Sequence, residues 1–139
     1  MGNSAKYDKY FYFRSVTDED DDDAAVNSVM VPVKNITGME PWDAITKIRV
    51  WFENVVAPKV AGGSFDKTAG QQGYADLTVT RGKIKEVMEA IASATNNGPH
   101  SDGITVIADD TTTDYDGSLR AGKYLHNDIT AVEDIVLVG

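Results

Sequence analysis

Cysteine is absent from this chain of 139 residues. Its absence excludes disulfide bonds, thiolate catalysis, iron–sulfur clusters and zinc sites with cysteine ligands. Histidine is scarce as well, and the two that occur, His100 and His126, are too far apart for a zinc-binding spacing. No serine lies in a G-x-S-x-G sequence, and no glycine-rich segment has the order of a P-loop. The sequence therefore predicts no enzymatic activity and no cofactor.

Positive charge is also in short supply. Only 13 basic residues stand against 22 acidic ones, which gives a net charge of −9. Binding to nucleic acid or to an anionic membrane surface draws on clustered Lys and Arg, so this balance argues against both partners. No apolar run approaches the ~20 residues that span a bilayer, and Met1 to Lys6 lacks the apolar core of a signal peptide. We therefore expect a soluble protein, and the length suits a single domain over residues 1–139.

Two segments are expected to be loops. The first contains an uninterrupted acidic run from Asp18 to Asp23, and without this run the net charge of the remainder is only −3. Neighbouring like charges repel one another into solvent, so residues 17–25 are predicted to form an exposed acidic loop. The second segment, residues 58–73, is rich in glycine and poor in large apolar residues. Long loops of this kind carry function or are mobile.

Hydrophobic patterning predicts an α+β fold. Alternating or aromatic-rich stretches indicate strands at 9–16, 28–34, 45–56, 74–80, 103–108 and 129–138. Gly38 and Pro41 indicate a turn over 35–41, and Pro32 indicates a sheet edge or a bulge. One helix is expected at 83–96, where Ile84, Val87 and Ile91 fall on one stripe. The expected architecture is a mostly antiparallel sheet, or a partial barrel, of about six strands with this amphipathic helix packed on it.

Aromatic side chains supply candidate interface anchors. The first strand carries rings on both of its faces, with Tyr10 and Tyr12 on one and phenylalanines on the other. Such a strand is either central in a sheet or covered by another subunit. Trp51 lies among charged residues on the outer parity of its strand, and Trp42 precedes that strand. Tryptophan and tyrosine are enriched at protein interfaces, so these four residues are predicted to anchor a partner.

Oxygen ligands cluster in one later segment. The cluster consists of Asp109, Asp110, Asp114 and Asp116. Hard cations such as calcium prefer carboxylates, and Gly117 suits the glycine of an EF-hand loop. Thr112 replaces the first acidic ligand of that loop and Lys123 replaces its final Glu, so the EF-hand pattern is incomplete. A weak metal site and a solvated polar loop remain as alternatives.

Basic residues gather at the expected start of the helix. Arg81, Lys83 and Lys85 lie within five residues there. The amide groups at a helix N-terminus attract anions, so this cluster is a candidate site for an anion or an acidic partner. The alternative is a solvated cluster paired with neighbouring glutamates on the helix.

Four blocks of sequence suggest a relationship to known proteins. The blocks are Tyr10-Phe11-Tyr12-Phe13-Arg14, Val31-Pro32-Val33 leading to Thr37-Gly38-Met39, the helical segment from Gly82 to Ile91, and the segment from Asp102 to Asp110. In their order along most of the chain they resemble a group of short proteins of marine tailed phages, notably cyanophages. The resemblance implies a phage origin and a non-enzymatic virion component or accessory factor, found in the virion or in the host cytoplasm.

The sequence thus favours a non-enzymatic structural or interaction protein that forms a homo-oligomer in a phage particle, where other virion proteins are further possible partners. Two alternatives stay open. One is a small binding module that recognises a host protein or an anion through the 58–73 loop or the basic helix start. The other is a calcium-dependent or metal-dependent domain that uses the cluster between Asp109 and Asp116.

Overall fold

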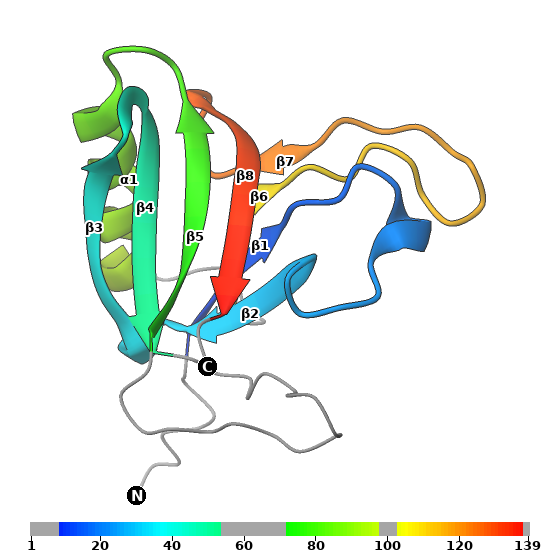
Figure 1. Ribbon diagram of the computed structural model, residues 1–139, viewed down its shortest axis with the longest axis horizontal. Helices are drawn as coiled ribbons and strands as arrows, with labels where there is room; N and C mark the ends of the chain where they lie inside the picture. The colour runs from blue at the N-terminus through cyan, green and yellow to red at the C-terminus, as the bar shows by residue number, and fades with distance from the viewer. Residues whose placement is uncertain (1–8, 54–71, 98–102, 138–139) are drawn as a thin grey trace, which may run out of the picture.

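The computed structural model describes residues 9–53, 72–97 and 103–137, and these form two four-stranded sheets with one α-helix (Figure 1). The first sheet has the strand order β2-β1-β6-β7 and the second has the order β3-β4-β5-β8. The strands of the first sheet are β1 (Tyr10–Arg14), β2 (Ser28–Pro32), β6 (Ile104–Asp109) and β7 (Lys123–Tyr124). Those of the second are β3 (Ile36–Trp42), β4 (Ala44–Glu53), β5 (Gln72–Val79) and β8 (Ile129–Leu137), and the helix is α1 (Ile84–Asn97).

A single hydrophobic core joins the two sheets and the helix. Helix α1 lies behind β3 and β4 in Figure 1 and buries Val87 and Ile91, one turn apart, against the second sheet. Phe11 and Phe13 of β1 bring the first sheet into the same core. The remaining fully buried large side chains are Val31, Ile48, Val50, Phe52, Leu77, Ile107, Ile129 and Thr111. Both sheets therefore depend on the same buried apolar surface.

The α+β class, the single amphipathic helix and the predominance of antiparallel pairing are confirmed. The structure divides the strands between two sheets that do not close into a barrel, and it includes one parallel pair, β1 with β6. Strand β1 is flanked by β2 and β6, so its aromatic residues lie in a central strand. Pro32 ends β2, which is an edge strand, where its missing amide hydrogen costs no ladder bond.

The turn expected over 35–41 is wrong, because these residues form most of strand β3. Ile36 and Met39 pack against the core, and this burial outweighs the local turn signals. The signals remain visible as irregularities, since the pairing of β3 with β4 shifts register next to Gly38 and again after Pro41. An edge strand tolerates both, because its outer side needs no ladder partner.

The two segments expected to be loops are residues 17–25 and residues 58–73. Of the glycine-rich segment 58–73, residues 58–71 lie outside the described residues, and Gln72 and Gly73 begin strand β5. Residues 17–25 contain a short 3-10 helix, Glu19–Asp21.

In the described part of the chain, the structure has no helix with the length and apolar content that a bilayer crossing requires.

Thr105 of β6 offers a test of the core. The residue is only 8% exposed, and its hydroxyl oxygen is buried without a hydrogen-bond partner. A buried hydroxyl without a partner costs about 1–3 kcal/mol, so the near-isosteric substitution Thr105→Val is expected to raise the free energy of unfolding by about 1 kcal/mol. Urea denaturation followed by far-UV circular dichroism measures the change.

The matched control is Thr111→Val. Thr111 is fully buried as well, but its hydroxyl donates a 2.8 Å hydrogen bond to the carbonyl oxygen of Val16. Losing that bond should destabilise the protein by about 1 kcal/mol. Equal destabilisation by both substitutions would show that the Thr105 hydroxyl is satisfied after all.

Candidate functional site

The outer face of the second sheet carries a cluster of aromatic and charged side chains. Side chains alternate along a strand, so while Ile48 and Val50 of β4 point into the core, Arg49 and Trp51 point outward. Strand β5 pairs with β4 in a register that sets Asp76 opposite Arg49 and Tyr74 opposite Trp51. Cross-strand neighbours of this kind lie within contact distance. The strand register therefore assembles the cluster.

Arg49 and Asp76 form a bidentate ion pair at its centre. The Arg49 Nε lies 2.8 Å from Asp76 Oδ1, and its second contact, from Nη2 to Oδ2, is 2.9 Å. The two residues are only 8% and 5% exposed although they lie on the outer face. The hydrogen bond to Asp76 raises the pKa of Arg49 against the opposing effect of burial. Arg49 therefore keeps its charge, and both members of the pair have little contact with water.

Three aromatic rings shield the pair from water. The guanidinium carbon of Arg49 lies 3.8 Å from the ring centroid of Trp42 and 3.6 Å from that of Tyr74. Trp51 lies 5.3 Å from the same carbon and contacts both other rings edge-on. Cations over aromatic faces are attracted by the ring quadrupole, most strongly where water is excluded. We call Trp42, Arg49, Trp51, Tyr74 and Asp76 the aromatic face.

The aromatic face is firmly held but not fully covered. The indole Nε1 of Trp51 donates a 2.6 Å hydrogen bond to Glu40 Oε2, which fixes that ring. Trp42, in contrast, is 39% exposed, and Ile45, on the outward parity of β4, is 48% exposed. An ordered surface with an exposed tryptophan over an arginine has the composition of an interface hot spot.

The predicted interface residues divide between the two sheets. Trp42 and Trp51 come together on the aromatic face, with their ring centroids 6.5 Å apart. Tyr10 and Tyr12 lie on β1 in the first sheet and are half-buried. Sequence reasoning missed the roles of the remaining members of the face, Arg49, Tyr74 and Asp76. The outward parity of Arg49 and Trp51 was a usable signal, but only the register between strands selects their partners.

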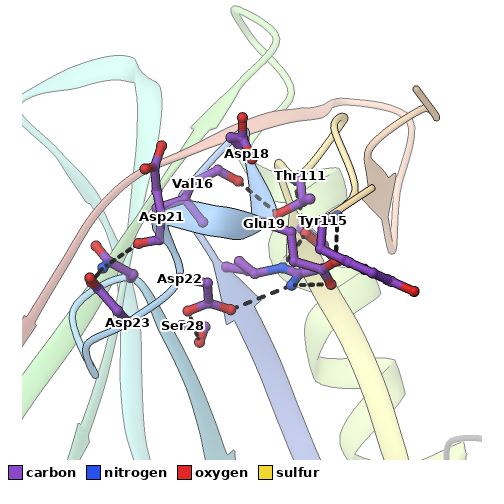
Figure 2. A network of polar contacts seen from close by, with 12 residues as sticks. Val16, Asp18, Glu19, Asp21, Asp22, Asp23, Ser28, Thr111 and Tyr115 are labelled. Atoms are coloured by element: carbon purple, nitrogen blue, oxygen red, sulfur yellow. Dashed lines mark hydrogen bonds and ion pairs between the residues drawn. The ribbon is translucent and has the colours of Figure 1, made fainter. Parts of the chain in front are cut away.

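A second polar cluster, the arginine junction, lies where β1 and β6 end side by side. Arg14 and Asp109 are register partners in this parallel pair, and two contacts of 2.9 Å join the guanidinium to the carboxylate. Arg14 also reaches Asp22 at 3.4 Å and Glu19 at 3.7 Å, both in the acidic run (Figure 2). One guanidinium thus gathers carboxylates from two distant segments.

The acidic run is consequently folded back rather than fully solvated. The amide of Glu19 donates to the carbonyl of Thr113, and the amide of Tyr115 donates to Glu19 Oε1, both at 2.9 Å. Glu19 and Asp22 are half-buried, whereas Asp20, Asp21 and Asp23 are exposed. The positive charge of Arg14 offsets the mutual repulsion that the sequence alone predicts for this segment.

The four aspartates predicted as candidate metal ligands each form ion pairs or hydrogen bonds with other protein groups. Asp109 pairs with Arg14 and lies 3.5 Å from Arg120, which also holds Asp114 at 2.9 Å. Asp110 accepts hydrogen bonds from the hydroxyl of Tyr124 at 2.7 Å and from the amide of Val132 at 2.9 Å, and exposed Asp116 accepts from the amide of Ser118. Within residues 9–53, 72–97 and 103–137, no group of three acidic or histidine side chains could hold a metal ion.

The neighbouring carboxylates Asp109 and Asp110 have opposite pKa shifts. Burial would raise the pKa of Asp109, but hydrogen bonds from Arg14 and the Thr111 amide, with the charge of the arginines, outweigh it and lower the pKa. Burial raises the pKa of Asp110 in spite of its two hydrogen bonds. Burial, followed by the bond to Asp110, raises the pKa of Tyr124. Through its hydrogen bonds with Tyr124 of β7 and Val132 of β8, Asp110 links the first sheet to β8. Its carboxylate oxygens are thus already engaged within the protein.

The candidate anion site lies apart from both clusters. Arg81, Lys83 and Lys85 are exposed at the turn between β5 and α1, and the amide of Lys83 donates to the carbonyl of Thr80 in that turn. We call these three residues the basic turn. Arg81 and Lys83 precede α1, and Lys85 lies in its first turn.

Substitution at the aromatic face should show how much it depends on its ion pair. Asp76→Asn leaves the buried Arg49 without its counter-charge, and we expect a loss of ~3 kcal/mol in the free energy of unfolding. The double substitution Arg49→Met with Asp76→Leu removes both charges and should recover most of that loss. Urea denaturation measures both changes.

Lys47→Met is the matched control on the same strand. Lys47 pairs with Glu133 at 2.9 Å, but the two side chains are 25% and 40% exposed. Solvent screens an ion pair at such a position, so this substitution should have little effect on the free energy of unfolding. A cost for Asp76→Asn no greater than that of Lys47→Met would contradict the central role of the Arg49 pair.

The opposite shifts at Asp109 and Asp110 predict opposite pH dependences. The lowered pKa of Asp109 gives a stabilisation that is present above its unfolded pKa and lost as the pH falls through the folded value. Asp109→Asn should therefore be strongly destabilising at neutral pH, and its cost should shrink in acid. Unfolding free energies from about pH 3 to about pH 8 measure this dependence.

Asp110→Asn is the companion variant. Because the pKa of Asp110 is raised, its ionised form is disfavoured in the folded protein, and its contribution declines as the pH rises through the folded value. An amide can accept from the Val132 amide and donate to the Tyr124 oxygen, so this variant should be nearly neutral at pH 7. A cost that grows in acid for Asp109→Asn would show that the assigned direction of its shift is wrong.

Comparison of the chain with protein-family models, with curated proteins and with solved structures finds no match in any of the three.

Proposed function

We propose that this chain is a non-catalytic interaction protein that associates with a second copy of itself through the aromatic face. The observation that carries the proposal is Trp42, which stacks on the buried Arg49 yet keeps 39% of its own surface exposed. Tryptophan and arginine are the residues most enriched at interface hot spots. The face is ordered before contact, so little conformational entropy is lost when it is covered.

The rim of the face suits a second copy as the partner. A two-fold contact brings a patch against itself, so any charged rim of that patch is self-complementary when it carries both signs. Lys47 lies on the outward parity of β4, between Glu133 at 2.9 Å and Asp43 at 3.8 Å. Across a two-fold axis the lysine of one copy can approach the carboxylates of the other. Exposed Ile45 adds apolar surface to the same face.

The arrangement of buried charge supports a structural rather than a catalytic role. Arg49 and Asp76 neutralise each other on the aromatic face, and Arg14 and Asp109 do so at the arginine junction. Charged groups that are paired with each other hold the surrounding strands and rings in place and do not point toward a substrate. The resemblance to short phage proteins favours a phage particle as the assembly in which the contacts occur, with the virion or the host cytoplasm as the location.

The self-association is tested by Ile45→Glu. The substitution places a negative charge on the proposed contact at a residue that is 48% exposed, so the monomer should fold normally. We expect the wild-type chain to show a mass above that of a monomer in light scattering at several concentrations, and the variant to shift toward a monomer. An uncompensated charge in an interface weakens association by about tenfold or more.

Met30→Glu is the matched control, because Met30 is 41% exposed but lies on β2 of the other sheet. It should leave the mass unchanged. A wild-type chain that is monomeric at every concentration would overturn the proposal. The phage assignment has its own test, because mass spectrometry of purified particles of a phage that encodes the chain should detect it in the virion.

A further inference from the structure

A second exposed apolar site lies at the end of the loop between β6 and β7. This loop, residues 110–122, projects beyond both sheets, and we call it the finger (Figure 1). Tyr115 and Leu119, near its tip, are 76% and 82% exposed, more than any other large apolar side chain in the described part of the chain. Large apolar side chains exposed near one loop tip are a candidate contact surface.

The finger is braced in this position. The amide of Gly117 donates to the carbonyl of Asp114, and the amide of Asp114 donates to the carbonyl of Ser118, both at 2.8 Å. At its base Arg120 pairs with Asp114 at 2.9 Å and approaches Asp109 at 3.5 Å. The Tyr115 amide is held by Glu19 of the acidic run, as Figure 2 shows. The tip is therefore already in place for a partner.

The surroundings of the tip define the charge of that partner. The acidic run docks on the finger through Glu19 and carries the exposed residues Asp20 and Asp21 in the positions that follow, and Asp116 is exposed near the tip. These carboxylates favour a basic surface as the one that covers Tyr115 and Leu119. The long aliphatic stems of Lys and Arg can cover leucine, and their charged ends can lie over a tyrosine ring.

The chain itself carries a surface of this kind in the basic turn. Arg81, Lys83 and Lys85 are all exposed, and they precede or begin α1, on the opposite side of the molecule from the finger (Figure 1). The finger and the basic turn of one copy are thus too far apart to meet. Two copies can bring the finger of one against the basic turn of the other.

We propose that the finger of one copy docks on the basic turn of a second copy. Tyr115 and Leu119 supply the apolar contact, and the exposed carboxylates of the finger and of the docked acidic run face Arg81, Lys83 and Lys85. Such a contact joins two different surfaces, so it propagates head to tail into a ring or an open chain. It does not use the aromatic face and does not depend on that proposal.

Charge exchange tests the contact. All chains carry Ile45→Glu, so that association through the aromatic face is absent, and the dissociation constant is measured by sedimentation velocity at low salt. Asp20→Lys with Asp21→Lys should weaken association by about tenfold, because attraction becomes repulsion. Ile45→Glu changes the net charge of −9 to −10, and the two Asp→Lys exchanges then change it to −6. A mere reduction of overall repulsion would strengthen association instead, so the direction of the change is decisive.

Rescue supplies the second arm. Lys83→Glu with Lys85→Glu should weaken association similarly, and the chain that carries all four exchanges, with the original net charge, should regain it. Tyr115→Ser with Leu119→Ser should also weaken it, whereas Val26→Ser, at a side chain 48% exposed directly after the acidic loop, should not. Tighter or unchanged association of the Asp20/Asp21 variant, failure of rescue, or a monomer at every concentration would overturn the proposal.

Discussion

The bidentate pair between Arg14 and Asp109 is the interaction on which the peripheral architecture depends. It joins the ends of β1 and β6, two strands that are distant in sequence and parallel in space. Because the same guanidinium reaches Glu19 and Asp22, it also draws the acidic run against the finger. Without this charge the run would be repelled from the finger carboxylates, and both segments would lose their mutual support.

In each sheet an arginine, buried in the second sheet and half-buried in the first, holds a buried aspartate through two parallel contacts. The planar fork of arginine matches a carboxylate in a way that the single ammonium of lysine does not. In the second sheet the flat guanidinium is also a surface on which Trp42 and Tyr74 can stack. Arg49 therefore pairs with the buried Asp76 and also positions the rings of Trp42 and Tyr74 above it. Exchange of either arginine for lysine would retain the charge and lose the geometry.

Hydrophobic periodicity predicted the elements that depend on local sequence, such as the helix. The helix expected at 83–96 is found as Ile84–Asn97, because its apolar stripe matches both its length and its packing. Strand β3 was missed, since its formation depends on burial against a core that the turn residues Gly38 and Pro41 do not reveal. Both arginine pairs were missed for a related reason. Arg14 and Asp109 are 95 residues apart, and Arg49 and Asp76 are 27 apart, so strand order and register must be known before either pair can be assigned.

Both tryptophans of the chain lie on the aromatic face, with their rings in edge contact. Intrinsic tryptophan fluorescence is therefore a local optical reporter of the outer surface of one sheet. It should respond when that surface is covered or when the second sheet melts, and remain largely silent to events at the finger. If the unfolding transitions from fluorescence and from far-UV circular dichroism have different midpoints, the second sheet unfolds separately from the rest of the molecule.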